Sequence, residues 1–85
     1  MTPVREIVEA TLTGKFQVLS EELEPEATLN SLDLDSLAVI ELLYTVGREL
    51  GVRVGEHEVT PRNTVSELVS VVEAKLAQRA AGPLQ

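Results

Sequence analysis

One serine in this chain is well placed to take part in chemistry. Ser36 lies in the run Leu34-Asp35-Ser36-Leu37, where an acidic loop meets the start of an amphipathic segment. A serine at such a junction is predicted to be exposed. The chain has no cysteine and a single histidine, His57, so it offers neither a disulfide framework nor a metal site with the usual number of ligands.

Ser36 is not predicted to be an enzymatic nucleophile. A catalytic serine needs a general base and an oxyanion hole, which often lie at a Gly-x-Ser-x-Gly turn, but the flanking residues here are Leu34 and Ala38. His57 lies in a polar stretch with no acidic partner predicted to orient it, which indicates a solvated surface residue. The sequence therefore favours a protein that is not an enzyme.

The two aspartates before Ser36 are not predicted to bind a metal. A calcium loop that began at Asp33 and Asp35 would need a glycine at its sixth position and a glutamate at its twelfth, where this chain has Ala38 and Tyr44. The remaining interpretation is that another enzyme modifies Ser36. A phosphodiester there would face unpaired backbone N–H groups and the positive end of a helix dipole.

The negative charge of the chain is concentrated around Ser36. The net charge is -7, and residues 16–47 contain seven acidic residues and no lysine or arginine. This segment would repel nucleic-acid phosphates, so the partners we expect are proteins with basic docking surfaces. On composition alone, the acidic loops could equally serve to keep a small protein in solution.

Length and composition favour one small helical domain. A chain of 85 residues forms a single core, and with one Phe, one Tyr and no Trp that core must consist of Val, Leu and Ile. No apolar run approaches the ~20 residues of a membrane span. The first six residues lack the basic-then-apolar order of a signal peptide, so the expected location is the cytoplasm, without membrane contact.

Apolar spacing predicts a first helix over about residues 3–18, with fraying or bending at Gly14. Residues 20–31 have no helical period and are predicted to form a long loop. The leucines of this region should attach it to the core. They are Leu23, Leu29 and Leu32.

The second helix is the clearest element of the sequence. Asp35 is predicted to cap its start and Gly51 to end it. Its buried face is expected to consist of Val39, Leu42, Leu43, Val46 and Leu50. Leu37, Ile40 and Tyr44 would then face a partner; the alternative is that this helix is buried on most sides.

Residues 52–55 are predicted to be an extended linker, and residues 56–59 one short helical turn before Pro61. Thr64 and Glu67 fit a capping box that opens a final amphipathic helix. The expected fold is all-α: a four-helix bundle of up-down type, with three main helices and one short helix, and a long loop between helices one and two. It would occupy residues 1–78 as a single domain, followed by a flexible tail, 79–85.

Three segments together resemble the acyl carrier protein family. They are residues 32–42, which contain Asp35-Ser36-Leu37, then Leu50-Gly51-Val52, and Thr64-Val65-Ser66-Glu67-Leu68. The resemblance implies that a phosphopantetheinyl transferase esterifies Ser36 with 4'-phosphopantetheine from coenzyme A. The chain would carry acyl groups as thioesters on that cofactor, and would be a monomer.

The resemblance also implies roles for other residues. Partner enzymes, which include acyl transferases, ketosynthases and other loading and processing enzymes, would dock on Asp35, Leu37, Ile40, Glu41 and Tyr44. The walls of a cavity for the acyl chain would be Val46, Val59, Leu68 and Val72, although each is equally suited to a plain core.

Two departures from the family pattern concern the pathway. Asp33 stands where the family commonly has glycine, and Ala38, Gly47 and Arg48 occupy positions that are frequently acidic in fatty acid carriers. The chain therefore resembles carriers of polyketide or other specialised biosynthesis more than carriers of primary fatty acid biosynthesis. Two alternatives remain: an aminoacyl or peptidyl carrier, and a helical interaction module in which Ser36 is only a helix cap.

Overall fold

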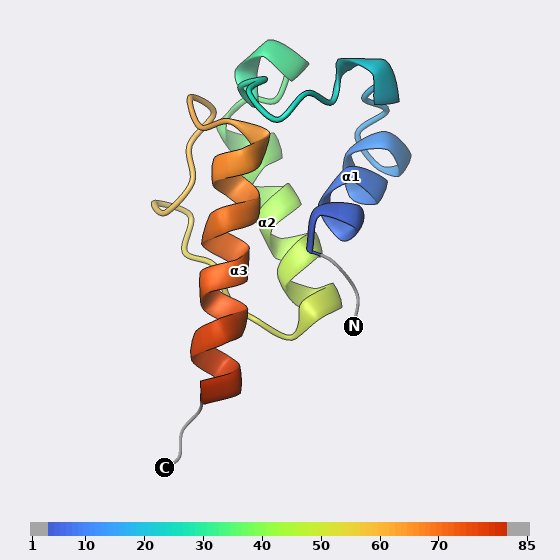
Figure 1. The fold of residues 1–85 in the computed structure, drawn as a ribbon. Helices are drawn as coiled ribbons and strands as arrows, with labels where there is room; N and C mark the ends of the chain where they lie inside the picture. Colours follow the sequence, from blue (N-terminus) through green and yellow to red (C-terminus); the bar gives the residue numbers. More distant parts are fainter. Residues whose placement is uncertain (1–3, 82–85) are drawn as a thin grey trace.

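The computed structural model describes residues 4–81, which form an all-α fold (Figure 1). Its three α-helices are α1 (Val4–Gly14), α2 (Ser36–Leu50) and α3 (Val65–Ala81). Two short 3-10 helices, Ser20–Glu22 and Asn30–Leu32, lie in the loop between α1 and α2. The described residues contain no strand, as expected for residues 52–55.

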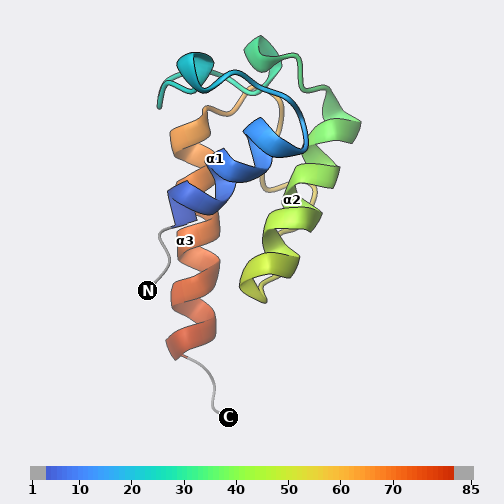
Figure 2. The same cartoon turned by 90° about the vertical axis from the view of Figure 1, so that its right-hand side faces the viewer.

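The helices do not alternate in direction as an up-down bundle would. The loop between α1 and α2 crosses one end of the molecule, and both α2 and α3 begin at that end and run away from it (Figures 1 and 2). Residues 51–64 return the chain along the side of the bundle to make this possible. The first turn of α2 therefore lies at the same end of the molecule as the loop and the start of α3.

The buried core consists of valine and leucine, two of the three aliphatic types that the composition predicted, since Ile7 is half-buried and Ile40 exposed. No polar or charged residue of the described part is buried. Helix α1 contributes Val4, Val8 and Leu12, and the predicted buried face of α2 is confirmed, with Leu50 half-buried at its edge. The fold is thus held by aliphatic packing, the largest favourable contribution available to a chain of this composition.

The first helix ends at Gly14, four residues before the predicted end at 18. Gln17 has a left-handed backbone (φ 61°), which no residue adopts inside an α-helix. The Val18 N–H donates to the Leu12 carbonyl at 2.9 Å, and Val18 is buried. The spacing of Phe16 and Leu19 predicted a longer helix, but the chain folds back there, which buries Val18 without helical geometry and leaves Leu19 exposed. The predicted start at residue 3 lies outside the described residues.

The long loop is attached to the core and to the start of α3. Leu29 and Leu32 are buried and Leu23 is half-buried, as predicted. The Leu29 N–H donates to the Asn63 carbonyl, and the Val65 N–H to the Ala27 carbonyl, both at 2.9 Å. These two bonds flank an isolated antiparallel bridge between residues 28 and 64.

The ends of α2 and α3 follow the predicted capping residues. Gly51 ends α2 in a left-handed conformation (φ 72°). The Thr64 N–H donates to Glu67 Oε1 at 2.9 Å, and the Glu67 N–H donates to Thr64 Oγ1 at 3.0 Å, so the capping box is confirmed. Helix α3 continues to Ala81, beyond the expected domain end at residue 78. The rest of the predicted tail, residues 82–85, lies outside the described residues.

The fourth helix predicted at residues 56–59 is a turn instead. The Glu58 N–H donates to the Gly55 carbonyl at 3.0 Å, and the Gly55 N–H donates to Glu58 Oε2 at 2.9 Å. Val59 points into the core, as predicted, with 1% exposure. Because the Glu58 carboxylate also accepts the Gly55 N–H and Pro61 follows soon after, these residues form a closed turn and do not continue as a helix.

The return segment lies directly against α2 at Gly47. The Val52 N–H donates to the Gly47 carbonyl at 2.9 Å, and a Cβ on Gly47 would lie 2.6 Å from the Val52 carbonyl oxygen. Only glycine allows this approach, because backbone atoms this close exclude any side chain. Gly47, near the end of α2, therefore lets the start of the return segment lie against the helix backbone.

Gly47→Ala is expected to lower the free energy of unfolding. Overpacking costs about 1–3 kcal/mol, more than the ~1 kcal/mol that alanine gains over glycine in a helix. Gly14→Ala is the matched control, since a Cβ there meets nothing within 4 Å. Urea denaturation should show stabilisation for Gly14→Ala alone; equal stabilisation by both changes would show that the close approach does not exist.

A second prediction concerns the half-buried ion pair between Glu58 and Lys75, which joins the turn to α3 at 2.9 Å. The hydrogen bond from Lys75, with that from the Gly55 N–H, lowers the pKa of Glu58. A lowered folded-state pKa stabilises the fold above the unfolded pKa of about 4.3, and this contribution disappears as the pH falls through the folded value.

Glu58→Gln should therefore lower the melting temperature at neutral pH, and the difference from the unmodified chain should shrink at acidic pH. Thermal melts across a pH series measure it. Glu73→Gln, at an exposed position of α3, is the control. A difference for Glu58→Gln that stays constant with pH would contradict a contribution from the charged carboxylate.

Candidate functional site

Ser36 is the first residue of α2 and is exposed. Asp35 precedes it in an extended conformation, and its carboxylate accepts the Ala38 N–H at 2.8 Å, so the predicted cap is confirmed. The N–H groups of the first helical turn have no carbonyl acceptor within the helix. A negatively charged group on the Ser36 hydroxyl would therefore lie at the favourable end of the α2 dipole.

The residue two positions before the cap has an unusual backbone. Asp33 ends the second 3-10 helix with φ 66° and ψ 28°, in the left-handed region. Glycine adopts this conformation without cost, and aspartate is among the few other residues that tolerate it. The geometry explains why glycine suits this position. It also shows how the chain turns sharply enough to begin α2 at Ser36.

One face of α2 remains uncovered along most of its length. Leu37, Ile40 and Tyr44 are 74%, 37% and 65% exposed, and their i, i+3, i+7 spacing places them in one row, the α2 stripe. The alternative that α2 is buried on most sides is therefore wrong. Asp35 and Glu41, the acidic members of the predicted docking set, are exposed on the same helix or its cap.

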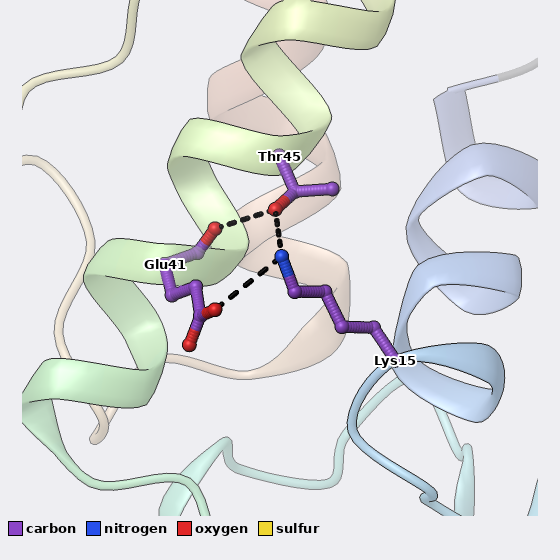
Figure 3. A network of polar contacts seen from close by, with 3 residues as sticks. All are labelled: Lys15, Glu41 and Thr45. Carbon is purple, nitrogen blue, oxygen red and sulfur yellow. Dashed lines mark hydrogen bonds and ion pairs between the residues drawn. The ribbon is translucent and has the colours of Figure 1, made fainter.

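Glu41 is paired within the chain, which the sequence did not indicate. Lys15 Nζ lies 3.3 Å from Glu41 Oε2 and donates to Thr45 Oγ1 at 3.1 Å, while Thr45 Oγ1 donates to the Glu41 carbonyl at 2.9 Å (Figure 3). Lys15 immediately precedes the base-free segment 16–47. The packing of α1 against α2 brings the Lys15 ammonium group to Glu41 and compensates its charge.

The four residues predicted to form an acyl cavity all lie in the packed core. Val46, Val59, Leu68 and Val72 are 0–1% exposed. A separate groove of about 240 Å³ opens on the surface one turn after Ser36. It is lined by Ile40, Leu43, Tyr44, Arg53, Val54 and Glu56. The cavity role of the four core residues stays a prediction.

The sequence model of a known family, described as "Phosphopantetheine attachment site", matches residues 4–72, from the start of α1 to the middle of α3. The chain belongs to this family. It is also similar to an acyl carrier protein of Thermosynechococcus vestitus, with 29% identity over 75 residues, which span 87% of this chain and 93% of the relative. The resemblance to acyl carrier proteins is thus confirmed. Members are carriers and not enzymes, and their cofactor is covalently attached 4'-phosphopantetheine.

The surroundings of Ser36 fit that cofactor. An exposed hydroxyl at the first turn of α2 is accessible to a modifying enzyme, and the cofactor supplies a thiol to a chain without cysteine. None of the helices within residues 4–81 is both long and apolar enough to cross a membrane. Carriers of this family interact with a phosphopantetheinyl transferase and with biosynthetic enzymes.

The cap at Asp35 yields a test that separates its hydrogen bond from its charge. Asp35→Ala should lower the free energy of unfolding by about 1 kcal/mol, because the Ala38 N–H loses its acceptor. Asp35→Asn keeps an acceptor of the same shape and should cost less. Urea denaturation measures both, and equal losses would contradict a capping role for the side-chain oxygen.

Proposed function

We propose that Ser36 carries the 4'-phosphopantetheine, and that the modified chain transfers acyl intermediates as thioesters between partner enzymes. The observation that supports this most directly is the exposed Ser36 at the capped start of α2, within the part of the chain that matches the attachment-site family. The helix dipole favours the phosphodiester that would form there.

The transfer can be written in full. The Ser36 hydroxyl oxygen attacks the phosphorus of coenzyme A that bears the pantetheine, and the bond between this phosphorus and the bridging oxygen breaks. Adenosine 3',5'-bisphosphate leaves, and the hydroxyl proton passes to a base of the transferase, which uses magnesium. The product is a phosphodiester on Ser36 whose distal thiol receives the acyl group.

For the pathway, we propose polyketide or related specialised biosynthesis. Support comes from the few uncompensated acids along α2: Glu41 is paired with Lys15, and Arg48 lies in the last turn. The partners would be acyl transferases, ketosynthases and other loading and processing enzymes. We propose that the chain acts as a monomer in the cytoplasm, where coenzyme A and these enzymes are available.

The attachment site is tested by mass spectrometry. Incubation with coenzyme A, magnesium and a broad-specificity phosphopantetheinyl transferase should add one phosphopantetheine mass to the intact chain. Ser36→Ala should abolish the gain, whereas Ser31→Ala, which changes an exposed loop serine, should keep it. An unmodified chain whose mass does not change would contradict the proposal and favour an interaction module in which Ser36 is only part of a helix start.

The cargo is tested with the modified chain. Incubation with malonyl-CoA and an acyl transferase should add a malonyl mass that hydroxylamine removes, as expected for a thioester. In parallel, amino acids and ATP are offered with an adenylating enzyme. Loading by amino acids alone would overturn the acyl assignment in favour of an aminoacyl carrier.

A further inference from the structure

The α2 stripe holds three of the four large apolar side chains that are exposed among the described residues. The fourth, Leu19, lies in the loop after α1. A contiguous apolar row on so small a protein marks an interaction surface. Its charges change along the helix, and this change indicates the kind of surface that would bind there.

The end of the stripe nearest Ser36 is strongly acidic. Asp33 and Asp35 are exposed there, and neither forms an ion pair with another residue of the described range. The loop that leads to this end adds further exposed acids. These are Glu21, Glu22, Glu24 and Glu26.

The middle of the stripe is electrically compensated. Glu41 is the acid of α2 closest in sequence to Ile40, and the Lys15 ammonium group lies 3.3 Å from its carboxylate. The Lys15 bond to Thr45 holds the ammonium group against the helix. A basic partner would have to compete with Lys15 for Glu41, so this part of the surface presents mainly Leu37 and Ile40.

Two guanidinium groups flank the far end of the stripe. The Arg48 guanidinium lies 5.7 Å from the centre of the Tyr44 ring, and Arg53 lines the groove on the other side together with Tyr44. Within residues 4–79, neither arginine has a carboxylate within 4 Å, although Glu49 and Glu56 line the same two hollows. This end therefore has balanced charge, with two guanidinium groups open to an acceptor.

We infer that the α2 stripe binds a protein surface of graded charge. That surface places basic groups opposite Asp33 and Asp35, an apolar hollow around Leu37 and Ile40, and a carboxylate beside Tyr44 within reach of the two arginines. The inference rests on the proposed function, since enzymes that act on an arm at Ser36 approach the same end of α2. It differs from the uniformly basic docking surface expected from the acidic sequence.

Three amphipathic helical peptides with identical apolar stripes provide the test. The graded peptide has lysines at one end and glutamates at the other, the uniform peptide has lysines throughout, and the mixed peptide interleaves the charges of the graded one. Each is titrated into the isotope-labelled, unmodified full chain, and binding is followed through amide chemical shifts.

The graded peptide should bind most tightly and shift the amides of Leu37, Ile40 and Tyr44. Combined Arg48→Glu and Arg53→Glu should weaken its binding about three- to tenfold, the size that two exposed ion pairs can supply, and should strengthen binding of the uniform peptide. Arg5→Glu reverses a single charge on α1, where Arg5 lies beside Glu9, and should change neither affinity.

Several results would overturn the inference. They are tightest binding of the uniform peptide to the unmodified sequence, unchanged affinities in the double arginine variant, or no peptide that shifts the stripe. Amides of the stripe that shift when the chain alone is diluted would show instead that a second copy covers this face. The peptide titrations use the chain without phosphopantetheine on Ser36, so the proposed docking surface and the proposed attachment site are tested independently.

Discussion

The hydrogen bonds between the long loop and the start of α3 determine where Ser36 lies. Besides the two that flank the bridge between residues 28 and 64, the Asn30 N–H donates to the Pro61 carbonyl at 2.8 Å and the Ser66 N–H to the Pro25 carbonyl at 3.0 Å. Backbone N–H and C=O groups that are removed from water need hydrogen-bond partners. Here the groups of the loop and of the segment that leads into α3 bond to one another. These bonds fix the loop within the fold, although few of its residues are helical.

This attachment explains the geometry of the site. With residues 25–30 held against residues 61–66, the chain has only a few residues in which to turn into α2, and Asp33 makes that turn in a left-handed conformation. Helix α1 and the return segment then pack against other sides of α2, and Gly47 lets that segment approach the helix backbone. One face of α2 remains open from Ser36 to Tyr44, so the proposed modification site and the proposed docking surface lie on one helix.

The sequence predicted those features that depend on neighbouring residues. Asp35, Gly51, Thr64 and Glu67 act within one helical turn of their own position, so their roles could be inferred from spacing alone. The exposed row of α2 followed from helical periodicity in the same way. The prediction of a fourth helix was wrong because the Glu58 carboxylate accepts the Gly55 N–H and closes a turn. This interaction competes with helix formation over the same few residues.

Features that depend on tertiary contacts were not predictable. Helix α1 was expected to reach residue 18 because Phe16 and Leu19 continue the apolar spacing, yet the chain reverses there, which buries Val18 and leaves Leu19 exposed. The pairing of Lys15 with Glu41 depends on the packing of α1 against α2, another contact between segments far apart in the sequence. From the sequence, Glu41 was simply another acid for a basic partner. The structure instead pairs Glu41 with Lys15 and leaves Asp33 and Asp35, at the Ser36 end of the helix, without an ion pair among the described residues.

Amide hydrogen exchange tests the central constraint most directly. If the loop is fixed to α3, the amides of Leu29, Asn30, Val65 and Ser66 should exchange slowly, with protection close to that of the core residues of α2. The Glu26 amide, which donates to no acceptor within the described residues, should exchange rapidly. Exchange of all four bonded amides as fast as that of Glu26 would contradict the account, because Ser36 would then follow a freely moving loop.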